Sequence, residues 1–358
     1  MKMEEPRIPH RPIGDGEQEL LDRLWEQTAA TGLNTPDPEG YADLQARIRR
    51  RMRIRRIRRI AVSGMAAAAA VVMAVLIVGR PEAPAADAFE QLARMGVEID
   101  RREVVMTTDD GQRMNLEEAA RLERAQSGGM ALNSGDGSIA LEAERQMKIE
   151  VPAGREFRLT LADGTEVWLN AGSTFEYPAS FEGLAERRVR LTGEAFFDVR
   201  RDTCRPFRVE TAQGECIRVL GTRFNVQAYA EEREHVTTLV EGRIAYRADE
   251  SADYLELAPD QQIRLDCDTE EASIRQVDAR AYAAWTEGWL WFEAEPLWRL
   301  AQRFERTYGI RIVVAEPLRG YTFTGKIRRE RGIDYILDLL AGTTGIRCEV
   351  EEGVMYLR

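Results

Sequence analysis

The sequence predicts a single-pass membrane protein with a short α-helical segment before the span, an all-β domain after it and a small α+β domain at the C-terminal end. Three observations lead to this prediction. Nine arginines fall between residues 47 and 59, and residues 60–79 then carry no charge. From residue 104, short alternating apolar runs are separated by turn signals such as Asp-Gly, which is typical of antiparallel strands. From residue 279, strand and helix patterns alternate.

Residues 60–79 are long enough to cross a bilayer as a helix. At about 1.5 Å per residue they extend about 30 Å, which is the thickness of the hydrocarbon core. A helix satisfies its own backbone groups in lipid, and arginine-rich flanks stay in the cytoplasm. We therefore expect an inner-membrane protein with a cytoplasmic N-terminus and, in a bacterium, a periplasmic C-terminus.

Other interpretations fit the same run. A cleaved signal peptide has a shorter positive region and an apolar core of about 7–15 residues. A buried helix of a soluble protein is favoured by the weakly apolar stretch Ala66–Ala70. The arginine block also suits nucleic acid, but its place beside a span makes membrane topology the simpler cause. The net charge is −11, and residues 80–358 carry 37 Lys and Arg against 51 Asp and Glu, so we expect no direct nucleic-acid partner for that part.

Residues 1–59, the expected cytoplasmic segment, contain two helix patterns. In the first, one face carries four apolar side chains: Leu20, Leu21, Leu24 and Trp25. The second begins near Tyr41 and runs toward the span. So short a segment buries little core of its own, which favours a protein partner for the first face. The alternative is that the two helices pack on each other.

Residues 80–103 are expected to form a periplasmic tether, and residues 104–278 the all-β domain. The clearest hairpin places Phe157, Leu159 and Leu161 on one face before a turn at Asp163–Gly164. A second, weaker hairpin surrounds Asp110–Gly111. Further short strand patterns follow at close spacing up to residue 266, which is typical of an all-β fold.

The pattern of residues 279–358 predicts a strand, a helix and a strand, followed by a strand, a helix and two strands. Pro296 stands at the expected start of the first helix and Gly309 at its end. The buried stripe of this helix is expected to consist of Leu297, Leu300, Phe304 and Tyr308. The pattern predicts a small α+β module made of two similar halves.

The chain offers little catalytic chemistry. It has two histidines, His10 and His235, and neither a phosphate-binding loop nor a dinucleotide motif. We therefore expect no enzyme acting on an external substrate, no metal and no cofactor. Glu194 and Asp198 lie near aromatic residues, but strand alternation explains that spacing.

The four cysteines match no zinc spacing. They are Cys204, Cys216, Cys267 and Cys348. Cys204 and Cys216 flank an expected hairpin and are one possible disulfide; four free thiols are the alternative.

Several motifs in order resemble one family. The stretches LADGTEVWLNAGSTFEYPASF, RRVRLTGEAFFDV, RPFRVET, VLGTRFNVQAY and TTLVEGRI are similar to those of FecR-type anti-sigma factors of Gram-negative bacteria, in the form common in Bacteroidetes. The stretch WTEGWLWFEAEPLWRLAQRFERTYGIRI resembles the C-terminal domain of that form, which is similar to the short N-terminal domain of secretins and TonB-dependent receptors. The resemblance extends from Val104 to Arg358. The stretch LAPDQQ replaces a Pro-Gly turn usual in the family, and the cytoplasmic segment has fewer helix signals than we would expect.

The resemblance implies a transmembrane regulator of transcription. Its cytoplasmic segment would bind an extracytoplasmic-function sigma factor. Its periplasmic part would contact the signalling domain of an outer-membrane TonB-dependent transporter loaded with a siderophore or glycan. For that contact we expect a face on the C-terminal module: Trp289, Trp291, Tyr321 and Phe323. The rival hypothesis is a membrane-anchored β scaffold that binds envelope polysaccharide and has no use for the Leu20 and Trp25 face.

The resemblance also implies possible self-cleavage between Gly221 and Thr222. Some members of the family cut themselves at a Gly-Thr in this motif. The hydroxyl of Thr222 would attack the carbonyl of Gly221, and His235 is the candidate imidazole on this side of the span. The alternative is a plain strand in which Gly221 forms a bulge and Thr222 fills a β-branched position.

Overall fold

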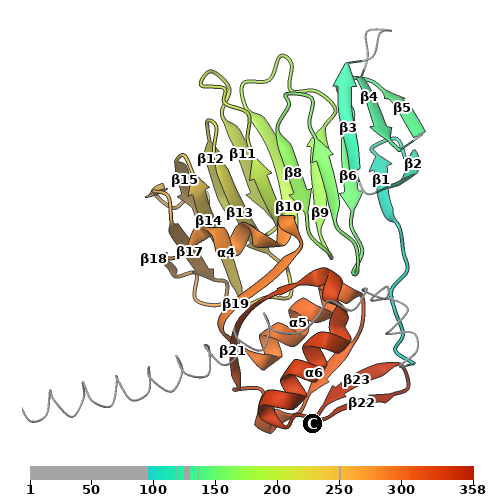
Figure 1. Ribbon diagram of the computed structural model, residues 1–358. Coiled ribbons are helices and arrows are strands. Elements are labelled where there is room, and N and C mark those ends of the chain that lie inside the picture. Colours follow the sequence, from blue (N-terminus) through green and yellow to red (C-terminus); the bar gives the residue numbers. More distant parts are fainter. Residues whose placement is uncertain (1–95, 118, 125–129, 136, 250) are drawn as a thin grey trace, which may run out of the picture. The chain divides into compact units, whose positions relative to one another are not determined.

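The computed structural model describes residues 96–358 except 118, 125–129, 136 and 250 (Figure 1). The expected cytoplasmic segment, the expected span and most of the expected tether lie outside the described residues. Within the described part, no helix has the length and apolarity needed to cross a membrane.

Residues 104–276 form two β layers that share one long strand, which confirms the predicted all-β organisation. The first layer runs in the order β2 (Arg113–Leu116), β1 (Val104–Thr108), β6 (Gln146–Glu150), β9 (Thr174–Pro178), β10 (Arg187–Asp198), β11 (Phe207–Thr211), β12 (Cys216–Val219), β15 (Ile244–Arg247) and β16 (Leu255–Leu257). The second runs in the order β5 (Gly137–Leu141), β4 (Met130–Ser134), β3 (Ala119–Arg124), β7 (Phe157–Thr160), β8 (Glu166–Leu169), β10 again, β13 (Arg223–Ala228), β14 (Glu234–Glu241), β17 (Gln261–Asp266) and β18 (Ala272–Gln276).

Strand β10 passes from one layer to the other at Gly193. Its residues 190–192 pair with β9, whereas residues 193–198 pair with β13. Gly193 has a φ of 106°, and a Cβ on it would lie 2.7 Å from the Cα of Ser173. Only glycine fits this close approach, so the residue permits the change of layer.

The apolar side chains of both layers meet in one core. Phe197 of β10 stacks on Phe224, with ring centroids 5.0 Å apart, and approaches Phe175 and Phe207 of the first layer at 6.1 Å. The predicted hairpin at Asp163–Gly164 is confirmed, because β7 and β8 pair across it with their apolar residues buried.

The C-terminal elements follow the predicted order. After α4 (Ala279–Ala283) and the 3₁₀ turn η1 (Ala284–Glu287) come β19 (Trp289–Pro296), α5 (Leu297–Tyr308), β20 (Ile312–Val314), η2 (Glu316–Leu318), β21 (Thr322–Arg328), η3 (Arg329–Arg331), α6 (Gly332–Thr344), β22 (Cys348–Glu351) and β23 (Val354–Leu357). Strand β19 pairs with β21, and β20, β23 and β22 form a second small sheet.

Helix α5 has the predicted ends and the predicted buried stripe. Pro296 is its N-cap, and Gly309 ends it in the left-handed conformation with its N–H bonded to Glu305. The four stripe residues are buried in a core separate from that of the β layers. The described residues therefore contain two apolar cores.

Candidate functional site

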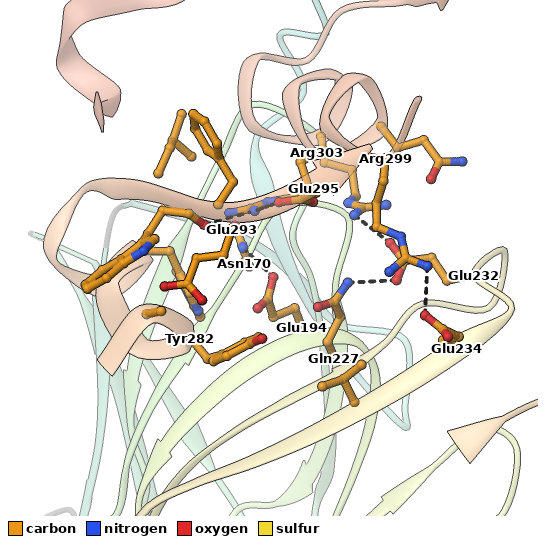
Figure 2. Close-up of a pocket in the computed structure, with 18 of the residues that line it drawn as sticks. Asn170, Glu194, Gln227, Glu232, Glu234, Tyr282, Glu293, Glu295, Arg299 and Arg303 are labelled. Atoms are coloured by element: carbon orange, nitrogen blue, oxygen red, sulfur yellow. Dashed lines mark hydrogen bonds and ion pairs between the residues drawn. The ribbon is translucent and has the colours of Figure 1, made fainter. Parts of the chain in front are cut away.

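A cavity of about 560 Å³ lies where α5 and β19 meet the outer face of the second β layer (Figure 2). The β layer contributes polar side chains to it, among them Asn170, Glu194 and Gln227. The C-terminal elements contribute arginines and tryptophans, among them Arg303 and Trp291. The lining is therefore mixed in charge.

Glu194 lies at the centre of this cavity in Figure 2 and is held by two amides. Asn225 Nδ2 donates to one carboxylate oxygen at 2.9 Å, and Asn170 Nδ2 donates to the other at 2.8 Å. Trp285 Nε1 in turn donates to Asn225 Oδ1 at 3.0 Å. Burial raises the pKa of Glu194, although the Asn225 hydrogen bond and the nearby charge of Arg303 oppose that shift.

Ion pairs connect the C-terminal elements to the β layer beside the cavity. Arg299 on α5 lies 2.7 Å from Glu234, and Arg306 lies 2.6 Å from Glu232. Arg306 also stacks over the ring of Tyr229 at 3.9 Å. Burial tends to raise the pKa of Glu234, but the hydrogen bond from Arg299 lowers it overall. We call this set of contacts the polar joint. Polar interfaces between domains permit relative motion more readily than apolar ones.

Residues 97–100 pack against the C-terminal elements, and we call this contact the clasp. The side chain of Val97 is 5% exposed and belongs to the C-terminal core. The N–H of Glu98 donates to the carbonyl of Gly353 at 3.1 Å, and the N–H of Asp100 donates to that of Gly309 at 2.7 Å. This part of the expected tether is therefore not a free linker. The apolar pair Val97 and Ile99 is the signal that could have found it.

Comparisons with known proteins agree with this organisation. A family model described as FecR protein matches residues 147–245, and one described as FecR, C-terminal, matches residues 289–357. Two crystal structures of a candidate anti-sigma factor from Parabacteroides distasonis ATCC 8503 share 32% identity with the chain. Each alignment has a TM-score of 0.54 and covers 59% of this chain and 98% of that chain. No curated protein matches the sequence.

The chain belongs to the family of FecR-type anti-sigma factors. Its general partner class is therefore a sigma factor. The polar joint lies between the parts matched by the two FecR models, because Glu232 and Glu234 belong to the first and Arg299 and Arg306 to the second. We use the names FecR domain for the β layers and FecR C-terminal domain for residues 289–357.

The expected transporter-binding face is partly exposed in the FecR C-terminal domain. Trp289 and Trp291 lie on one face of β19, under the cations of Lys326 and Arg328 on β21 at 4.0–4.7 Å. Tyr321 is 47% exposed. The prediction that Phe323 belongs to this face is wrong, because its side chain is 6% exposed and fills the domain core. A residue that packs the core is not available to a partner.

Gly221 and Thr222 lie between β12 and β13, in tight contact with neighbouring backbone. A Cβ on Gly221 would lie 2.7 Å from the Cα of Arg201, and the φ of Gly221 is 155°. The hydroxyl of Thr222 donates to the carbonyl of Arg243 at 3.1 Å. The bulge alternative expected irregular pairing at Gly221, but the register shift occurs beyond Thr222, between Arg223 and Phe224.

His235 is engaged elsewhere in the FecR domain. Its Nδ1 lies 2.5 Å from a carboxylate oxygen of Glu215, and its Nε2 lies 3.3 Å from the carbonyl of Tyr229. Tyr246 donates to the other oxygen of Glu215 at 2.7 Å. The structure therefore gives the imidazole no hydrogen bond to Thr222.

The four cysteines are free thiols in this structure. Cys204 is exposed and Cys216 is buried, so the two are not bridged although they flank the expected hairpin of β11 and β12. Among the described residues, no group of His, Cys, Asp and Glu side chains is arranged to hold a metal ion.

The residues of the polar joint were not predicted from the sequence. Arg299, Arg303 and Arg306 recur at a spacing that places them on one face of a helix, and three of the four residues from Glu231 to Glu234 are glutamates. These two patterns are complementary in charge. Together they were a signal that α5 contacts the segment between β13 and β14.

Proposed function

We propose that this anti-sigma factor relays a signal from an outer-membrane TonB-dependent transporter to an extracytoplasmic-function sigma factor. In this proposal residues 60–79 span the inner membrane once, the N-terminus is cytoplasmic and the C-terminus is periplasmic. The face of Leu20, Leu21, Leu24 and Trp25 holds the sigma factor. The face that carries Trp289 and Trp291 receives the signalling domain of the transporter.

The clasp is the observation that most supports the proposed relay. Residues 97–100 are close in sequence to the proposed span, and they are bonded to the FecR C-terminal domain at Gly309 and Gly353. A partner that moves or reshapes this domain therefore acts directly on the chain that leads to the membrane. The polar joint supports the same transfer, because a polar interface between two domains permits relative motion more readily than an apolar one.

The test is to open the clasp in the full chain expressed in its native host. Val97→Asp places a carboxylate in an apolar core and should detach residues 97–100. We expect the sigma-dependent transcripts to stop responding to inducing conditions, while the sigma factor still co-purifies with the chain. Arg101→Ala changes an exposed neighbour and is the matched control.

Two results would count against the proposal. If Val97→Asp keeps the full transcriptional response, with its altered protease sensitivity showing that the clasp is open, the clasp does not carry the signal. If no sigma factor co-purifies with the unmutated chain, or Trp25→Ala leaves its recovery unchanged, the cytoplasmic face is wrong. A chain that instead retains envelope polysaccharide would support the scaffold hypothesis.

Self-cleavage is a second proposal, favoured by the crowding of Gly221 against Arg201. The Thr222 oxygen would bond to the Gly221 carbonyl carbon, the peptide C–N bond would break, and the hydroxyl proton would pass to the released amine. Water would then hydrolyse the ester. Tags at both ends should reveal two fragments without added protease, none in Thr222→Ala and retained cutting in Thr222→Ser. A single intact band from the unmutated chain would leave the structural role alone.

A further inference from the structure

A second hollow, of about 470 Å³, lies on the FecR domain away from the polar joint. It is formed by the loop between β10 and β11 and by the turn between β7 and β8. Its lining residues are Asp163, Arg187, Arg200, Arg201, Asp202, Thr203 and Arg205. We call it the arginine hollow, because four guanidinium groups share it with two carboxylates.

The two carboxylates are already occupied by donors of the protein. Asp163 accepts from Arg187 Nη1 at 2.6 Å and from the N–H of Thr165 at 2.9 Å. Asp202 accepts from the N–H of Cys204 at 2.9 Å and from Arg205 Nε at 3.0 Å. The backbone N–H of Cys204 in particular holds the pKa of Asp202 below its usual range. The two carboxylates therefore offset the charges of Arg187 and Arg205, and the charges of Arg200 and Arg201 are not offset within the hollow.

Arg187 forms the base of the hollow and has a donor without an acceptor. Its side chain is 1% exposed, and its Nε donates to the carbonyl of Arg205 at 2.9 Å. Its Nη1 serves both Asp163 and the carbonyl of Arg200. Its Nη2 is buried and has no hydrogen-bond partner. A buried charged donor left unpaired is costly, which points to an acceptor that the protein itself does not supply.

The two remaining arginines stand at the rim in a constrained loop. Neither Arg200 nor Arg201 forms an ion pair with any carboxylate in the described part of the chain, and both are exposed. Arg200 lies against the turn, since its Nη1 is 3.0 Å from where a Cβ on Gly164 would stand. Arg201 lies against Gly221 through its Cα and Cβ, each 2.7 Å from where a Cβ on Gly221 would stand. The N–H of Arg200 also donates to Thr165 Oγ1 at 3.2 Å, so the backbone that carries the two cations is held at two points.

From this arrangement we infer that the arginine hollow binds a small oxyanion, of the phosphate or sulfate class. Planar guanidinium groups match the oxygens of such anions and bind them through paired hydrogen bonds. A doubly charged anion would balance the two unmatched arginines. It would also bring acceptor oxygens into the hollow that Arg187 lines. The hydroxyl of Thr203, which lines the same hollow, is a further donor.

The same chemistry occurs in a free phosphate ion and in the phosphate of a lipid headgroup. The test therefore begins with inorganic phosphate and the purified full chain, titrated by calorimetry in a buffer without other oxyanions. We expect saturable binding that protects the FecR domain against thermal unfolding. Arg200→Ala and Arg201→Ala should each weaken it about tenfold, the loss expected for one charged hydrogen bond.

Arg218→Ala is the matched control, because Arg218 is a partly exposed arginine of β12 outside the hollow. It should leave phosphate binding unchanged. Vesicles of phosphatidylglycerol and of phosphatidylcholine then separate the two sources. If the chain binds the phosphatidylglycerol vesicles and inorganic phosphate displaces it from them, the ligand is a lipid headgroup. If the chain does not bind these vesicles, the ligand is a free anion.

Two outcomes would overturn the inference. One is the absence of any saturable phosphate or sulfate binding by the unmutated chain. The other is binding that Arg218→Ala weakens as much as Arg200→Ala and Arg201→Ala do, since that would be general charge attraction. Both rim variants lie on the surface, so their folding can be checked by an unchanged melting profile without phosphate.

Discussion

The FecR domain and the FecR C-terminal domain bury different kinds of side chain. Buried polar and charged residues occur throughout the FecR domain, and among the described residues none lies beyond Gln262. Arg187, Glu215 and His235 are examples. The core of the C-terminal domain is apolar, and its charged residues lie around it.

The difference follows from size and from hydrogen bonding. Two large β layers enclose enough volume to surround a carboxylate with donors, as Thr211, His235 and Tyr246 surround Glu215. A buried polar group is tolerated when it is bonded in this way. The C-terminal domain is small, so nearly every interior position must contribute apolar packing. The stability of the FecR domain should therefore depend on pH, whereas that of the FecR C-terminal domain should depend mainly on the volume of its core side chains.

The largest effect should come from Phe304→Ala in the C-terminal core. Phe304 is buried, and removing a core phenylalanine costs about 3–5 kcal/mol. Because the two cores are separate, hydrogen exchange should increase across α5 and α6 while the FecR domain stays protected. Trp298→Ala, a less buried change on the same helix, is the control. Equal loss of protection in both domains would mean that they unfold as one unit.

A smaller effect is expected from Glu215→Gln in the FecR domain. The change keeps the shape but removes the charge opposite His235 and leaves a buried group imperfectly bonded. We expect a loss of about 1–3 kcal/mol in the free energy of unfolding of the FecR domain. Urea unfolding, followed by exchange in β12 and β14, measures it. Glu256→Gln, an exposed glutamate on β16, should leave that free energy unchanged.

The same pair predicts how stability depends on pH. Burial opposes the protonated form of His235, but its hydrogen bond and charge interaction with Glu215 raise its pKa overall. The stability it contributes is therefore present in full below the unfolded pKa, near 6.5, and is lost as pH rises through the folded value. Glu215→Gln should abolish this part of the pH dependence. A FecR domain whose stability does not fall over that window would contradict the raised pKa.

The smallest effect should come from breaking the polar joint. Arg306→Ala removes the contacts with Glu232 and Tyr229 that connect the two domains. A double-mutant cycle with Glu232→Gln should give a coupling energy of about 0.5–2 kcal/mol, since partly buried pairs contribute modestly. Arg319→Ala, which loses only the exposed pair with Glu316, is the control. A coupling energy of zero would show that the joint does not connect the domains.

Local patterns in the sequence were sufficient to predict individual strands, turns and helix ends. The turn at Asp163–Gly164 and the ends of α5 at Pro296 and Gly309 were predicted, because turn and cap residues act on their immediate neighbours. The family was also recognisable from consecutive strand motifs. Phe323 was misplaced for a local reason. In a continuous strand Phe323 and Tyr321 would lie on the same side, because they are two residues apart. Tyr321 precedes β21, however, so strand alternation does not relate the exposed Tyr321 to the buried Phe323.

Only the tertiary structure decided which distant residues meet. Val97 reaches the C-terminal core, Glu194 becomes the centre of a cavity, and Arg187 is buried beneath a surface loop. The surroundings of Arg187 and Glu194 do not follow from periodicity, because the strand β10 carries both residues and passes through two layers. What a strand residue faces depends on the layer that covers it. Sequence spacing specifies the side of a strand on which a residue lies, and the packing of remote segments specifies what lies there.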